Sequence, residues 1–136
     1  MSKVSGPLLD RIDIHIEAPS VKYKELANTQ EAECSAAIKK RVANTRTIQL
    51  ERFKNEGIFS NSQMHPKQIK KCCILEEPAK ELMRLAMTEL GLSARAYDKL
   101  LRIARTIADL AGAEVITSEF IFEAIQYRNL DRQLWL

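Results

Sequence analysis

The residues between Ser93 and Ala111 include four polar side chains that could serve chemistry: Arg95, Lys99, Arg102 and Thr106. They are spaced so that an α-helix would place them within a stripe of about 60°. Arg95 also falls in the first turn of that helix, where the helix dipole makes an isolated cation unfavourable. A bound anion would gain from both the free N–H groups and the guanidinium, so the position suits a phosphate-sensing arginine.

A solvated helix face explains the same spacing. In that interpretation Asp98 pairs with Arg102 and Asp109 pairs with Arg105, four residues apart on the surface. On spacing alone, the solvated face is the favoured interpretation of the stripe.

Arg11 is a second candidate because it joins a Gly6-Pro7 turn to a strictly alternating segment. Isoleucine recurs at every second position from Ile12 to Ile16, and this pattern predicts a strand that ends before Pro19. An arginine at such a strand edge can be held outward from a rigid base. An ordinary surface arginine, paired with a neighbouring aspartate, is the favoured interpretation without further context.

The predicted strand has no partner in this sequence, because no other segment alternates in the same way. A single strand cannot satisfy its own backbone hydrogen bonds. We therefore expect its sheet to lie upstream, in sequence that this chain lacks, and we expect residues 1–20 to be disordered or unusually paired.

The rest of the chain predicts an all-α fold. Residues 30–56 contain no Gly or Pro and predict one long helix with a thin apolar stripe, which packs lightly or extends as an arm. Its other faces carry basic residues: Lys39, Lys40, Arg41, Arg46, Arg52 and Lys54. Four further helices are predicted from Pro66 to Cys73, Pro78 to Leu90, Ser93 to about Ala111, and from Thr117 or Ser118 onward. We expect residues 61–136 to form a compact helical bundle.

Composition sets limits on function. The 136 residues carry a net charge of only +3, which supports a general nucleic-acid binder weakly. No apolar run approaches the roughly 18 residues of a membrane span, and the N-terminus has no secretion-signal core. Three cysteines without a Cys-x-x-Cys motif or a nearby pair of histidines favour reduced thiols in a cytoplasmic protein over a metal site.

Three segments resemble magnesium-chelatase-like AAA+ ATPases. Residues 5–13 (SGPLLDRID) are similar to the segment after sensor 1, which carries the arginine finger in related helicase-clade members. Residues 92–110 (LSARAYDKLLRIARTIADL) resemble the sensor 2 helix, and residues 124–132 (AIQYRNLDR) resemble the family's C-terminal region. The resemblance covers essentially the whole chain and is closest to the bacterial subgroup associated with competence and DNA branch migration.

The resemblance implies a division of the chain into three parts. Residues 1–20 would be the last strand of the ATPase core, residues 21–60 an insert helix or arm, and residues 61–136 the helical lid with sensor 2. Arg11 would be the arginine finger, reaching the γ-phosphate on a neighbouring subunit. Arg95 would be the sensor 2 arginine, with Arg102 as the alternative. The implied partners are an upstream AAA+ core, neighbouring subunits of a homo-oligomeric ring such as a hexamer, and DNA.

The sequence departs from the family by what it lacks. It has no Gly-x-x-x-x-Gly-Lys-Ser/Thr phosphate loop and no apolar strand ending in Asp-Glu. We therefore expect ATP and Mg²⁺ to be cofactors of a longer parent protein, and we expect neither to be bound stably by this chain alone. The alternatives are a stand-alone helical module that binds nucleic acid and a module that binds another protein.

Overall fold

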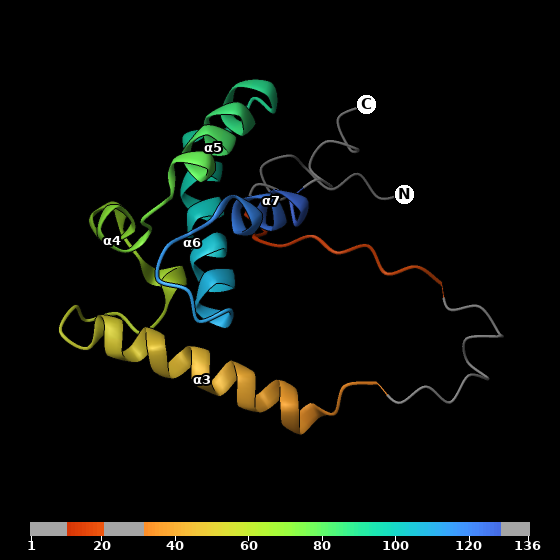
Figure 1. Ribbon diagram of the computed structural model, residues 1–136, viewed down its shortest axis with the longest axis vertical. Helices are drawn as coiled ribbons and strands as arrows, with labels where there is room; N and C mark the ends of the chain where they lie inside the picture. The colour runs from red at the N-terminus through yellow and green to blue at the C-terminus, as the bar shows by residue number, and fades with distance from the viewer. Residues whose placement is uncertain (1–10, 21–31, 129–136) are drawn as a thin grey trace.

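The computed structural model describes residues 11–20 and 32–128, and its regular elements are helical. The elements are α3 (Ser35–Phe53), the 3₁₀ turn η1 (Asn61–Gln63), α4 (Pro66–Cys72), α5 (Glu77–Glu89), α6 (Ala94–Leu110) and α7 (Ser118–Gln126). Helix α6 lies at the centre and contacts α3, α4 and α7, while α5 packs against α7 (Figure 1). The predicted helical bundle is therefore confirmed.

Helix α6 is central because it carries the most regular apolar face in the chain. Leu100, Ala104 and Ala108 follow one another at four-residue spacing, and all three are fully buried. They belong to the same hydrophobic cluster as Met83 of α5 and Ile121 of α7. The small alanines let neighbouring helices approach α6 closely, and burial of the larger side chains supplies the main stabilisation.

The helix boundaries follow the local signals in the sequence. Pro66 and Pro78 lie in the first turns of α4 and α5, where the missing N–H has no intrahelical partner to lose. The Ser93 hydroxyl accepts a hydrogen bond from Ala96 N at 3.2 Å and caps α6. Gly91 and Gly112 follow α5 and α6 with φ of 58° and 70°, a left-handed conformation that favours glycine.

Helix α3 is shorter than predicted and packs only over its C-terminal half. Its buried residues are Thr45, Gln49 and Phe53, whereas Ile38 and Val42, on the same stripe nearer the N-terminus, remain exposed. The N-terminal half of α3 accordingly extends beyond the other helices (Figure 1). This geometry agrees with the thin apolar stripe in the sequence.

Residues 11–20 form no strand, so the predicted strand from Ile12 to Ile16 is not confirmed. The described residues offer no neighbouring strand to receive it, and the isolated bridge they contain joins Leu75 to Ile116. The segment instead lies against the end of the bundle, where His15 N donates to Tyr127 O at 2.8 Å and Arg128 Nη1 donates to Ile12 O at 3.0 Å. Residues 1–10, also part of the predicted core remnant, lie outside the described residues.

Within the described residues, no helix combines the length and apolar character needed to cross a bilayer.

Candidate functional site

Arg95 lies in the first turn of α6, as predicted, and its side chain is exposed. The turn is held in place by the Ser93 cap and by the burial of Ala96 and Leu100 on the opposite side. The exposed guanidinium therefore stands near the positive end of the helix dipole on a fixed base. This position can receive an anion such as a phosphate oxygen.

The rest of the predicted polar stripe is covered by other parts of the chain, which corrects the expectation of a solvated face. The side chain of Lys99 is only 12% exposed, and its Nζ lies 2.8 Å from Asp13 Oδ1. Thr106 Oγ1 donates to Arg102 O at 2.8 Å and accepts a hydrogen bond from Asn61 Nδ2 at 3.0 Å. The segments that cover the stripe, residues 13–16 and 61–64, are distant from α6 in sequence.

Arg102 is half-buried and engaged with the backbone. Its Nη2 donates to Met64 O at 2.8 Å, in place of the predicted pair with Asp98. Its Nε is buried and has no hydrogen-bond partner among the described residues. Arg102 also lines a cavity of about 380 Å³ that it shares with the apolar side chains of Ile14, Ile16 and Ile107. Arg102 is thus part of the packing between α6 and the segments that cover it.

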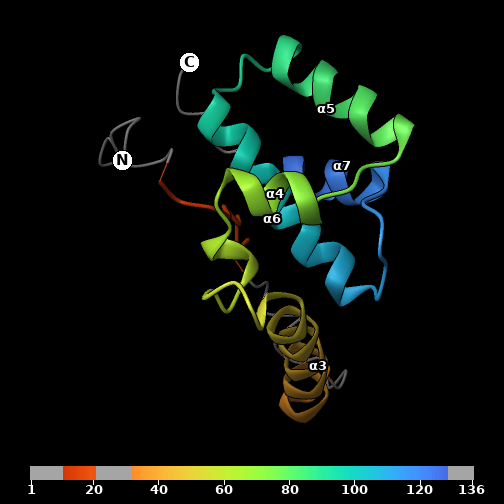
Figure 2. The same ribbon diagram turned by 90° about the vertical axis from the view of Figure 1, so that its left-hand side faces the viewer.

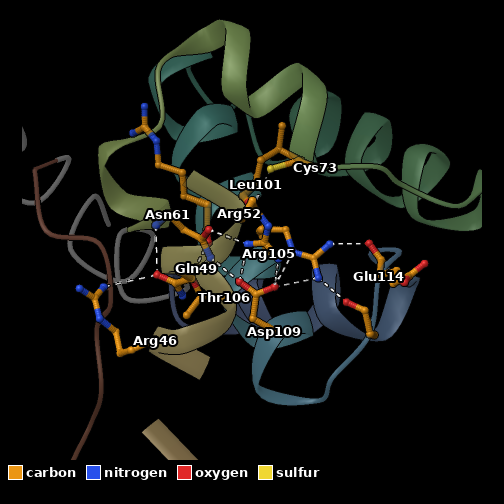
Figure 3. Close-up of polar contacts among 12 residues, drawn as sticks. Arg46, Gln49, Arg52, Asn61, Cys73, Leu101, Arg105, Thr106, Asp109 and Glu114 are labelled. Atoms are coloured by element: carbon orange, nitrogen blue, oxygen red, sulfur yellow. Dashed lines mark hydrogen bonds and ion pairs between the residues drawn. The ribbon is translucent and has the colours of Figure 1, made fainter. Parts of the chain in front are cut away.

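A buried ionic cluster occupies the C-terminal half of α6, where the sequence had suggested a surface ion pair. Arg105 and Asp109 do pair, but they are only 2% and 3% exposed. Asp109 accepts hydrogen bonds from Arg105 Nε at 3.0 Å, from Arg52 Nη1 at 2.7 Å and from Asn61 Nδ2 at 2.8 Å (Figure 3). One carboxylate therefore joins α3, η1 and α6.

The cluster extends to both of its flanks. Arg105 Nη1 donates to Glu114 O at 2.6 Å and Arg105 Nη2 donates to Ala113 O, which fixes the connection between α6 and α7. On the other side, Gln49 Oε1 accepts from Asn61 N at 3.2 Å. Every member of this buried set is hydrogen-bonded, as a charge removed from water requires.

The cluster also sets the protonation state of Asp109. Burial acts to raise the pKa of Asp109, but hydrogen bonds from Arg52 and Asn61 and the charge of Arg105 outweigh burial, so its pKa is lowered. The hydrogen bond to Asp109 likewise raises the pKa of Arg52. Asp109 is therefore a stable anion at neutral pH, and its chemistry is structural, because its oxygens are occupied and shielded from solvent.

The structure places the three predicted site residues in different settings. Arg95 and Arg102 share α6 and lie about 10 Å apart along its axis. Arg11 is exposed, on the separate segment that lies against the end of the bundle. Among the described residues, no group of three His, Cys, Asp or Glu side chains could hold a metal ion.

The sequence did not predict the ionic cluster, because Arg52 and Asp109 are 57 residues apart. One signal in the sequence does point to it. Arg105 comes directly after the core residue Ala104 and lies three residues before Ala108, on the buried side of α6. An arginine at a core position requires a buried anion nearby.

Comparison with known proteins identifies the family. Residues 32–128 match the family described as "Magnesium chelatase, subunit ChlI C-terminal". The chain is 38% identical over 135 residues to competence protein ComM of Haemophilus influenzae, covering 98% of this chain and 26% of ComM. It is 36% identical over 135 residues to the uncharacterized protein YifB of Escherichia coli, again covering 98% of this chain and 26% of the relative. It is 27% identical over 129 residues to the uncharacterized protein Rv2897c of Mycobacterium tuberculosis, covering 95% of this chain and 25% of the relative.

The chain thus spans about a quarter of the length of these relatives. The family match extends over all the described helices, including α3 and the central helix α6. The chain belongs to the magnesium chelatase subunit ChlI C-terminal family and is the C-terminal part of a magnesium-chelatase-like AAA+ protein of the ComM and YifB type.

Proposed function

We propose that this chain is the lid and sensor region of a ring-forming AAA+ ATPase, in which Arg95 contacts the phosphates of bound ATP. The observation that supports the proposal is the exposed position of Arg95 in the first turn of α6, the helix that organises the bundle. A change in the phosphates at this point would act on the whole lid through a single rigid helix. Such coupling of a phosphate to the position of a domain is typical of nucleotide-driven switches.

The geometry favours Arg95 over Arg102 for this role. Arg102 is half-buried and already donates to Met64 O, so a phosphate contact would have to break that bond and displace residues packed around it. Arg95 is exposed and lies nearer the helix N-terminus, where the dipole adds to its attraction for an anion.

Arg11 has the second role in the proposal, as an arginine finger that acts on ATP bound to the neighbouring subunit. Its exposed side chain, next to a backbone held by Arg128, supports this role. A guanidinium supplied by the next subunit stabilises charge that develops on the transferred phosphoryl group.

The phosphate loop and the Mg²⁺ ligands would come from an upstream ATPase core in the same longer protein. The four glycines of this chain are isolated, at positions 6, 57, 91 and 112, and build no phosphate cradle. In this proposal residues 1–20 complete the core, residues 21–60 form the insert arm and residues 61–136 form the lid. The assembled protein would be a cytoplasmic homo-oligomeric ring, such as a hexamer, that remodels DNA.

The test is ATP turnover by the full-length protein, compared with its Arg95→Ala variant after both are shown to assemble equally. We expect a loss of about ten-fold or more, which corresponds to about 1.4 kcal/mol of barrier. Arg84→Ala is the matched control, because Arg84 is also an exposed helical arginine and its side chain pairs with Glu81 on the surface of α5. Equal turnover in the two variants would contradict the sensor role of Arg95.

Arg11 is tested by mixing subunits. Subunits that carry Arg11→Ala are mixed with subunits whose own ATP site is disabled by a substitution in the upstream phosphate loop. Each variant alone should be inactive, whereas mixed rings should regain turnover, because an intact Arg11 from the second variant can serve the intact ATP site of an Arg11→Ala neighbour. Mixed rings that stay as inactive as either variant alone would contradict action across the interface.

A further inference from the structure

The positive charge of the chain is concentrated in α3, α4 and the loop between them. Residues 35–73 contain nine Lys and Arg residues and two Glu residues, a net charge of +7. The whole chain has a net charge of only +3, so the remaining residues together carry −4. The weak overall charge therefore conceals one strongly basic part, and a basic part of this kind attracts polyanions.

The exposed residues of helix α4 are Pro66 and three lysines. Lys67, Lys70 and Lys71 are exposed, whereas Ile69 on the opposite face is buried in the core. Lys71 Nζ lies 2.7 Å from Glu56 Oε1, but Lys67 and Lys70 have no ion pair with any described residue. The C-terminal end of α3, which Lys54 follows, lies on the same side of the molecule as α4 (Figure 2).

An exposed aromatic side chain lies between these lysines in sequence. Phe59 is 61% exposed, in the loop that joins Lys54 to α4. The loop is well anchored, because Phe59 N donates to Gln63 Oε1 at 2.8 Å and the nearby Asn61 and Met64 are buried. The ring is therefore presented to solvent from a fixed backbone, within the same basic part of the chain as Lys67 and Lys70.

We propose that Phe59, Lys67 and Lys70 form a binding surface for single-stranded nucleic acid, here called the α4 basic surface. Lysines along a surface attract the phosphates of a strand, and an exposed aromatic ring stacks on an unpaired base without regard to its identity. A duplex keeps its base faces covered, so the aromatic ring gives single strands the advantage. The lysines would also attract an acidic protein, but such a protein would have no base to stack on Phe59.

This surface goes beyond the proposed sensor function, since it shares no residue with Arg95 or Arg11. Its test also needs no ATP. Loss of the sensor effect and loss of nucleic-acid binding are therefore separate results, and each proposal can fail alone.

The experiment measures binding of the chain to a fluorescent oligothymidine by anisotropy at several salt concentrations. The oligonucleotide should exceed the roughly 4–16 nucleotides that such surfaces occupy. We expect Phe59→Ala to weaken binding about ten-fold, in the range found for loss of one stacked base. Phe122→Ala is the matched control, because Phe122 is a comparably exposed phenylalanine, at 55%, on α7 outside the basic part; it should leave affinity within about two-fold.

The lysines are tested by the dependence on salt. The double variant Lys67→Gln, Lys70→Gln should reduce the slope of log affinity against log salt by about 1.4, since each phosphate contact with a single strand contributes about 0.7. The control, Lys80→Gln with Arg84→Gln, removes two exposed charges from α5 and should leave the slope unchanged.

Three results would overturn the proposal. They are the absence of oligothymidine binding at low salt, equal losses from Phe59→Ala and Phe122→Ala, and binding of duplex DNA or polyglutamate as tight as that of oligothymidine. All substitutions are at exposed positions, and melting curves would verify that each variant is folded.

Discussion

At its C-terminal end, α6 buries Arg105 and Asp109 in a cluster that reaches α3, η1 and the connection to α7. At its N-terminal end, the same helix exposes Arg95 beside a serine cap. Arginine is therefore buried in an ionic cluster at one end of α6 and exposed to solvent at the other end. Buried charges are useful for fixing the relative position of segments, whereas an exposed guanidinium can be reached by an anion from outside.

The buried end of α6 connects the exposed end to the rest of the domain. A residue that senses a phosphate can move a domain only if its helix is firmly joined to that domain. The cluster around Asp109 supplies this connection, since it joins α6 to α3 through Arg52 and to the loop before α7 through Arg105. Substitutions at one end of α6 at a time therefore test whether the two ends have these different roles.

The largest effect is expected for Asp109→Ala. Loss of this carboxylate leaves Arg52 and Arg105 without their buried anion, so the free energy of unfolding should fall by about 3–5 kcal/mol in urea denaturation. Glu51→Ala is the control, because it removes only an exposed ion pair with Lys54 and should cost less than about 1 kcal/mol. Similar losses in both variants would contradict a structural role for the cluster.

Acid should weaken the same cluster. The pKa of Asp109 is lower in the folded state than its ordinary value, so its contribution to stability is fully present above that ordinary value, near 4. The contribution is lost as pH falls through the lower pKa of the folded state. Wild-type stability should therefore decrease below about pH 4 more steeply than that of Asp109→Asn, as measured by urea denaturation at a series of pH values. Parallel curves would contradict this assignment.

A smaller effect is expected at the other end of the helix. Ser93→Ala removes the hydrogen bond to Ala96 N and should cost about 1 kcal/mol, measured by thermal melting. Thr117→Ala is the matched control at the N-cap of α7, where the threonine hydroxyl makes no capping bond and has no partner among the described residues. Ser93→Ala should therefore be the more costly substitution, and an equal or larger cost for Thr117→Ala would contradict a capping role for Ser93.

Sequence alone predicted the helices because their signals are local. Pro78 lies in the first turn of α5, Ser93 caps α6 and Gly112 follows its last turn, and each signal acts within one turn of the residue concerned. The order and approximate bounds of the helices from residue 66 onward could therefore be predicted before their packing was known.

The burial and the partners of the polar side chains on α6 depend on contacts between segments that are distant in sequence, and spacing along one helix does not show such contacts. The polar stripe of α6 looked solvated because its spacing gives no sign that residues 13–16 and 61–64 cover it. Arg52 looked like one more surface charge of a basic helix, although its partner is Asp109. Arg95, in the first turn of α6, has the exposed position that the helical pattern had predicted.

The most direct test compares Arg95→Ala with Arg102→Ala in the full-length protein, with ATP turnover and thermal unfolding measured on the same preparations. Arg95→Ala should lose about ten-fold or more in turnover while its melting temperature stays unchanged. Arg102→Ala should lower the melting temperature, because it removes the hydrogen bond to Met64 O, and should retain the larger share of turnover. Full turnover in Arg95→Ala, together with a ten-fold loss in a stably folded Arg102→Ala, would contradict the account and move the phosphate contact to Arg102.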